Sequence, residues 1–173
     1  KRYALDLLSI LLGGNSSSFL YSEIREKIGL AYYVYSWSDQ LGDCGYLGMA
    51  AGVPHDKLDA VVENIVSICS KIKNGGISSS DLDSAKSYLR GQTALRFEAS
   101  DEIANFVASQ ELFYNEVKQP SDILKKIEAV EKEDILKIAQ ELFRPEKLSL
   151  AVVGRHEGGE KTNKFYKKIL ANL

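Results

Sequence analysis

The chain has few of the residues on which metal sites, disulfide frameworks and covalent catalysis depend. Its 173 residues include two histidines and two cysteines. Neither His55 nor His156 begins an H-x-x-E-H motif, in which a helix presents two zinc ligands and a glutamate base. Cys44 and Cys69 lack metal-ligand spacing and are typical of ordinary thiols in a reducing compartment. We therefore expect this segment to hold no metal or cofactor of its own.

Other functional classes are disfavoured in the same way. There is no G-x-S-x-G nucleophile motif, and Gly13-Gly14 is too short to cradle a phosphate. A net charge of -2 and a pI near 5.8 give no electrostatic case for binding nucleic acid. No apolar run approaches the roughly 20 residues that span a bilayer, and no signal peptide is visible. Because residue 1 is lysine, we expect a fragment of a longer protein. The ordinary thiols and the lack of a visible signal peptide favour a cytoplasmic location.

Apolar periodicity predicts a helix-rich chain with a few strands. An apolar fraction of 45% and a charged fraction of 27% suit one globular domain. Ser18 is expected to cap one helix, and Ser78 with Asp81 has capping-box spacing. The expected helices are 3–12, 18–28, 56–72, 78–97, 101–114, 121–127 and 132–143. The expected strands are 32–41, 46–53 and a buried one at 148–153.

This order predicts an α+β fold in which helices cover one face of an antiparallel-rich sheet. The glycine-rich segment 42–45 between the first two strands indicates a hairpin. The helix 101–114 is expected to be anchored by its apolar side chains, Ile103, Phe106, Val107 and Leu112. We expect residues 1–154 to form the domain and residues 155–173 a polar tail with a short helix near 165–170.

The stretch 12–41 is the centre of this organisation. It contains a helix that ends at Gly29, where a left-handed residue can stop the helix, and the strand that follows. Arg25 is near the helix end and Tyr32 opens the strand, so both polar tips could face one cleft. The alternative is that Arg25 forms a surface ion pair with Glu23 or Glu26 and that Tyr32 only packs in the strand.

The same stretch resembles a known family. Residues Gly13, Gly14, Ser17 and Ser18 are followed by Arg25-Glu26-Lys27 and then by Gly29-Leu30-Ala31-Tyr32. This order resembles the second-domain signature of the pitrilysin-type zinc peptidases, which include insulin-degrading enzyme and the mitochondrial processing peptidase. The resemblance continues to the LSLAVVG segment and covers roughly Tyr3 to Gly154.

The resemblance implies a processing-peptidase-like metallohydrolase half-domain. Domains of the family begin with strands before the first helix, and this chain lacks them, so we expect a sheet that is open at one edge or completed elsewhere. The family would place Arg25 and Tyr32 in substrate binding and oxyanion stabilisation. Phe19 and Tyr21 depart from the family pattern, in which Arg and Phe are frequent, so any subsite on this helix surface stays open.

The resemblance also implies partners. We expect zinc in an H-x-x-E-H-containing domain or subunit, a dimeric arrangement in the full protein, and an extended peptide or unfolded protein as substrate, which could add to an exposed sheet edge. The segment alone should then be inactive. Two alternatives remain: a catalytically silent structural subunit, like the core subunits of the cytochrome bc1 complex, or a protein-interaction domain. Likewise, Tyr33, Tyr35 and Trp37 share one strand face, which core packing and a peptide-binding wall explain equally well.

Overall fold

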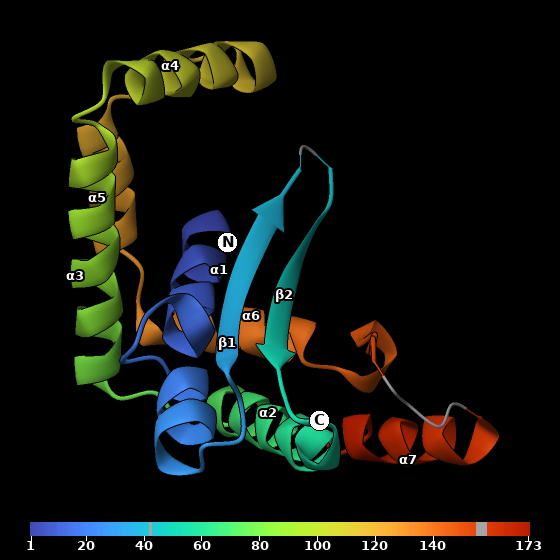
Figure 1. Cartoon of the computed structure of the whole chain (residues 1–173). Helices are drawn as coiled ribbons and strands as arrows, with labels where there is room; N and C mark the ends of the chain where they lie inside the picture. Colours follow the sequence, from blue (N-terminus) through green and yellow to red (C-terminus); the bar gives the residue numbers. More distant parts are fainter. Residues whose placement is uncertain (42, 155–158) are drawn as a thin grey trace.

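The computed structural model describes residues 1–41, 43–154 and 159–173 (Figure 1). Gly42 in the predicted turn, and residues 155–158 with His156 in the predicted tail, lie outside the described residues. The helices are α1 (Arg2–Ser9), α2 (Leu58–Lys73), α3 (Ser79–Arg96), α4 (Ser100–Tyr114), α5 (Pro120–Glu128), α6 (Lys132–Leu142) and α7 (Glu160–Leu170). Two π-helical segments, η1 (Ile10–Gly14) and η2 (Tyr21–Lys27), two 3₁₀ turns, η3 (His55–Lys57) and η4 (Pro145–Lys147), and two strands, β1 (Tyr33–Gln40) and β2 (Gly45–Gly52), complete the elements.

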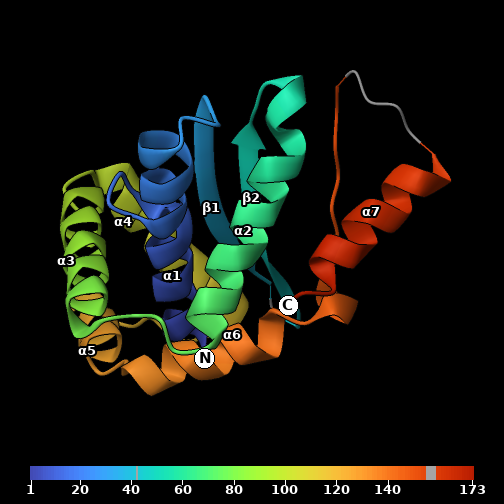
Figure 2. The same cartoon turned by 90° about the horizontal axis from the view of Figure 1, so that it is seen from below.

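The two strands form the predicted antiparallel hairpin. Tyr33 is paired with Gly52 at one end and Gln40 with Gly45 at the other. Alternate residues of β2, Leu47, Met49 and Ala51, pack against the hydrophobic core. The helices α1 and α2 lie along that face of the hairpin (Figure 2). The α+β class with an antiparallel sheet is therefore confirmed.

The central helical segment, α1 with η1, fixes the hairpin to the core. Its apolar side chains Leu7, Leu8 and Leu12 are fully buried. The Ser36 hydroxyl on β1 donates to the carbonyl oxygen of Ser9 over 2.6 Å. At Gly13 the two backbones approach so closely that an added Cβ would lie 2.5 Å from the Ser36 nitrogen. Glycine is therefore required where the helix passes the strand.

Of the two helix caps predicted from the sequence, one is present and one is not. The Ser78–Asp81 capping box is present: the Ser78 hydroxyl accepts from the Asp81 amide, and the Asp81 carboxylate accepts from the Ser78 amide. The predicted cap at Ser18 is wrong, because its hydroxyl donates backward to the carbonyl oxygen of Asn15 over 2.6 Å. The Asn15 side chain instead accepts from the Ser17 amide over 2.8 Å, which stabilises the turn before η2.

The predicted strand at 148–153 is absent. This segment has no strand assignment, and Val153 is 100% exposed. A strand needs a neighbour to satisfy its backbone groups, and within the described ranges the sheet contains β1 and β2 only. The final β element of the predicted order is therefore wrong for the described chain.

Three of the four anchors predicted for α4 are wrong. This helix turns sharply away from the end of α3 (Figure 1), and Gln110 is its buried residue. Ile103, Val107 and Leu112 are exposed, because the body of the domain does not extend beneath them. The fourth predicted anchor, Phe106, is half-buried: its ring lies 4.7 Å from that of Phe97, the residue that caps α3, and so joins the middle of α4 to the end of α3.

The helix predicted near residues 165–170 begins earlier, at Glu160. It packs on α2, where Tyr166 and Ile169 form a small cluster with Val62 and Val66. The Tyr166 hydroxyl donates to Asp59 Oδ1 over 2.7 Å. Among the described residues, no helix is both long enough and apolar enough to cross a membrane.

Candidate functional site

Arg25 lies on the outer surface of η2. Its guanidinium carbon is 5.1 Å from the centre of the Tyr21 ring, a cation–π contact that holds the side chain while leaving it exposed. Glu23 pairs instead with Lys27, with 2.7 Å between Nζ and Oε1. The ion pair between Arg25 and Glu23, one of the alternatives considered from sequence, is therefore replaced by a contact with Tyr21.

Tyr32 lies just before β1 and is 82% exposed. Its amide donates to the carbonyl oxygen of Gly52 over 2.8 Å, so the backbone is held at the open end of the hairpin. Its ring meets Tyr33 edge to face, with 6.5 Å between centroids. The phenolic oxygen makes no hydrogen bond to any residue that the structure describes, and it is available to a ligand.

The backbone between Arg25 and Tyr32 is a tight, buried junction. Gly29 adopts the left-handed conformation at φ +65°, and the Leu30 amide donates to the carbonyl oxygen of Ile24 over 2.9 Å. Leu30 is buried, as is the next residue, Ala31. The two side chains therefore project from a fixed junction, each beside a tyrosine of its own. A joint role for Arg25 and Tyr32 stays a prediction.

The outer face of the hairpin is aromatic. Ring centroids are 5.9 Å apart between Tyr33 and Tyr35 and 5.5 Å apart between Tyr35 and Trp37. Trp37 also meets Tyr46 of β2 edge to face at 6.5 Å. We call Tyr33, Tyr35, Trp37 and Tyr46 the aromatic row; all four are exposed. Of the two explanations left open by the sequence, core packing is excluded for this domain as it stands.

The aromatic row lies over small residues. Trp37 is paired with Gly48 and Tyr33 with Gly52, and a Cβ on either glycine would collide with the opposing ring. The rings of Trp37 and Tyr33 can therefore pack flat against the backbone of β2. The alternation of Tyr33, Tyr35 and Trp37 could have indicated this row, but the sequence does not say which face of the strand the helices cover.

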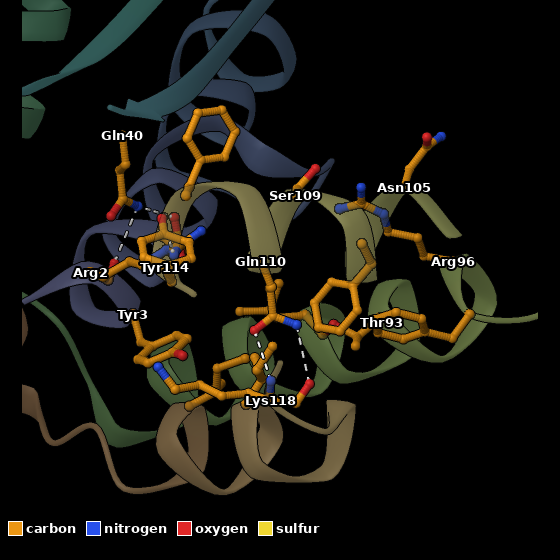
Figure 3. Close-up of a pocket in the computed structure, with 17 residues that line it drawn as sticks. Arg2, Tyr3, Gln40, Thr93, Arg96, Asn105, Ser109, Gln110, Tyr114 and Lys118 are labelled. Carbon is orange, nitrogen blue, oxygen red and sulfur yellow. Dashed lines mark hydrogen bonds between the residues drawn. The ribbon is translucent and has the colours of Figure 1, made fainter. Parts of the chain in front are cut away.

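A cavity of about 420 Å³ lies among α1, α3, α4 and α5 (Figure 3). Several of its polar groups bond to one another. The Gln110 side chain donates to the carbonyl oxygen of Lys118 and accepts from its amide, at 3.1 and 3.2 Å. Arg2 donates to the Tyr114 hydroxyl over 2.9 Å. These hydrogen bonds join α4 to the rest of the domain. They do not align a nucleophile with a base.

Asp6, at the edge of this cavity, was not identified from the sequence. Its Oδ1 accepts from the Gln40 amide group over 2.6 Å and from the Ser38 hydroxyl over 3.0 Å, which ties α1 to the end of β1. Burial raises the pKa of this carboxyl, and the Ser38 hydrogen bond, the Arg2 charge and the Gln40 hydrogen bond oppose that shift. The feature of the sequence that could have indicated Asp6 is that it is a single aspartate within an otherwise apolar helix.

The residues described do not fit a zinc site. No group of three His, Cys, Asp or Glu side chains within residues 1–41, 43–154 and 159–173 could hold a metal ion. His55 is exposed in η3. Cys69 is buried against Met49, with 3.9 Å between the sulfur atoms, and burial raises the pKa of its thiol to about 12. This thiol stays protonated and is a poor nucleophile or ligand.

Known proteins resemble this chain over most of its length. The family model of the peptidase M16 inactive domain matches residues 1–89, which include the whole junction and the hairpin. A protein of Streptomyces coelicolor named as an uncharacterized zinc protease is 32% identical over 156 residues, which cover 89% of this chain and 33% of that protein. The chain thus spans about a third of the length of such relatives.

Solved structures show the same fold. A Helicobacter pylori protease superimposes with a TM-score of 0.72 at 32% identity, covering 81% of this chain and 34% of that one. A chain of complex III from Candida albicans gives a TM-score of 0.70 at 15% identity, covering 80% and 35%; at that identity the likeness is one of fold alone. The resemblance seen in the sequence is confirmed: this chain belongs to the pitrilysin-type M16 family of zinc peptidases, as a domain of its inactive type.

Proposed function

We propose that this chain serves a zinc-dependent endopeptidase as its non-metal-binding half, in which Arg25 and Tyr32 bind an extended peptide and stabilise the transition state. The observation that carries the proposal is the junction itself: both polar tips are exposed, while Leu30 and Ala31 between them are buried. Donors held on a fixed backbone lose little entropy when a substrate binds.

Tyr32 is assigned to the carbonyl oxygen of the scissile peptide. Negative charge develops on this oxygen when water attacks the carbonyl carbon, and a phenol positioned there donates a hydrogen bond that strengthens as the charge grows. The exposed hydroxyl of Tyr32 is free to take this role once another domain closes over it and excludes water.

In this proposal Arg25 binds the peptide substrate. A guanidinium presents fixed N–H donors that suit a peptide carbonyl or carboxylate, and its position over Tyr21 limits the orientations it can take. Zinc and its activated water would belong to an H-x-x-E-H-containing domain, either elsewhere in a longer polypeptide or in a partner subunit of a dimer. The chemistry that this metal supplies is the generation of the nucleophile.

The test compares variants in the complete peptidase. Tyr32→Phe should lower kcat roughly 100-fold, the effect of removing one oxyanion donor, with little change in KM. Arg25→Ala should mainly raise KM. Tyr88→Phe and Arg90→Ala, two exposed positions on α3, serve as matched controls and should leave both constants unchanged. Wild-type kinetics in both Tyr32→Phe and Arg25→Ala would overturn the proposal.

The isolated 173-residue chain gives a second measurement. It should bind no stoichiometric zinc and cleave no peptide, whereas activity should return with the domain that carries H-x-x-E-H. If no such domain is found in the whole protein or a co-purifying subunit, the chain is a structural subunit of the same fold and the enzymatic assignment is wrong.

A further inference from the structure

The aromatic row forms an unusual surface. Its rings come from residues spaced by two along β1 and from Tyr46 opposite, so they lie on one face of the sheet. The remaining positions of this face on β2 are Gly48, Ala50 and Gly52. The formal charge on the strand residues of this face is the carboxylate of Asp39, to which the Tyr46 hydroxyl donates over 3.2 Å. The face therefore offers electron-rich rings, one anion and no cation.

Elsewhere in the chain, aromatic faces are used by cations. Arg25 lies over Tyr21 at 5.1 Å, Lys71 over Phe19 at 5.2 Å and Arg2 over Tyr114 at 5.6 Å. In the part of the chain that the structure describes, no lysine or arginine lies over a ring of the aromatic row. These rings are of the electron-rich types, tyrosine and tryptophan, and their outer faces are open.

Resting on the proposed peptidase function, we propose that the aromatic row binds the cationic side chains of an extended peptide. Arginine or lysine at alternate positions would lie over Tyr33, Tyr35 and Trp37, and Asp39 would attract a cation at the far end of the strand. The row adjoins Tyr32 through the Tyr32–Tyr33 ring contact, so a peptide on it leads directly to the proposed catalytic tyrosine. Charge complementarity selects this partner, because the face has no group to neutralise an acidic peptide.

Trp37 makes the binding measurable, because it is the only tryptophan of the chain. The probe is a synthetic peptide of about seven residues that alternates threonine with arginine and spans roughly 20 Å when extended. In titrations of the full 173-residue chain it should change Trp37 fluorescence in a saturable way. The matched peptide has citrulline for each arginine, which keeps the shape and removes the charge. It should bind ~3- to 30-fold more weakly, the range for one or more cation–π contacts.

Variants of the chain locate the contact. Tyr35→Leu should weaken binding of the arginine peptide several-fold, Tyr35→Phe should retain most of it, and Asp39→Asn should weaken it at low salt. Tyr88→Phe on α3 is the control. Equal affinity for the arginine and citrulline peptides would overturn the proposal, as would concentration-dependent dimerisation that shields Trp37, because a second copy would then be the occupant.

The two proposals fail separately. Unchanged kinetics in Tyr32→Phe would remove the catalytic role but leave the difference between arginine and citrulline peptides intact. Loss of that difference would remove the cation site but leave the effect of Tyr32→Phe on kcat.

Discussion

The two faces of the hairpin differ in the size, polarity and burial of their side chains. One face of β1 carries Val34, Ser36 and Ser38, lies against α1 and is largely buried. The other face carries Tyr33, Tyr35 and Trp37, and each of these rings is exposed. The small and partly polar face is inside, whereas the large aromatic face is outside.

This inversion has a physical cause. The helix passes β1 at Gly13 with backbone contact, so the covered face of β1 has room only for a small side chain at Ser36. The hydroxyls of Ser36 and Ser38 are satisfied there by Ser9 and Asp6. The inner face thus stabilises the fold by close approach and hydrogen bonds, and the outer face stays exposed. Substitutions on the two faces should therefore have different consequences.

The largest effect is expected where the close approach is made. In Gly13→Ala the new methyl group would meet the backbone of Tyr35 and Ser36, which cannot move aside as a side chain could. We expect a loss of about 3 kcal/mol in the free energy of unfolding, measured by chemical denaturation. The matched control is Gly91→Ala in α3, where a Cβ meets nothing within 4 Å; it should gain up to about 1 kcal/mol. Equal effects of the two substitutions would contradict the close-approach argument.

The next prediction compares the loss of stability caused by substituting two neighbouring residues of β1, one on each face. Val34→Ala removes buried methyl groups and should cost about 2 kcal/mol. Tyr35→Thr replaces the ring with a β-branched residue that suits an exposed strand position, and it should cost at most about 1 kcal/mol, from lost ring contacts. Denaturation of both variants tests the order. A larger loss for Tyr35→Thr would mean that the aromatic row belongs to the stabilising core.

Local signals allowed much of the fold to be predicted from the sequence. The Ser78–Asp81 box lies within one helical turn, and the hairpin is fixed by a short glycine-rich connection. Local signals could not show whether the segment 148–153 forms a strand, because a strand depends on a neighbouring strand that its own residues do not specify. The same holds for α4, whose apolar periodicity is that of a buried helix although most of its apolar side chains are exposed.

The candidate site was predicted in part. The family motif indicated Arg25 and Tyr32, whose role stays a prediction, and the helix-to-strand junction between them is present, with Gly29 in the left-handed conformation that the turn requires. The aromatic row could not be assigned, because hydrophobic alternation would place Tyr35 and Trp37 inside. The contacts of α1 and η1 with β1, including the close approach at Gly13, decide that the serine face is covered, and these contacts are distant in sequence.

The smallest expected effect concerns Asp6, which holds the inner face near the hairpin turn through Ser38 and Gln40. Its pKa is raised above the ordinary 3.8 chiefly by burial, so the folded protein binds more protons than the unfolded chain between 3.8 and the raised value. The free energy of unfolding therefore falls as the pH rises through that window. Asp6→Asn removes the titration while an amide oxygen can still accept from Ser38 and Gln40. Relative to the parent, this variant should become progressively more stable as the pH rises from 3.8, measured by denaturation at a series of pH values. A difference that moves in the opposite direction would show that the hydrogen bonds and the charge of Arg2, rather than burial, dominate at Asp6.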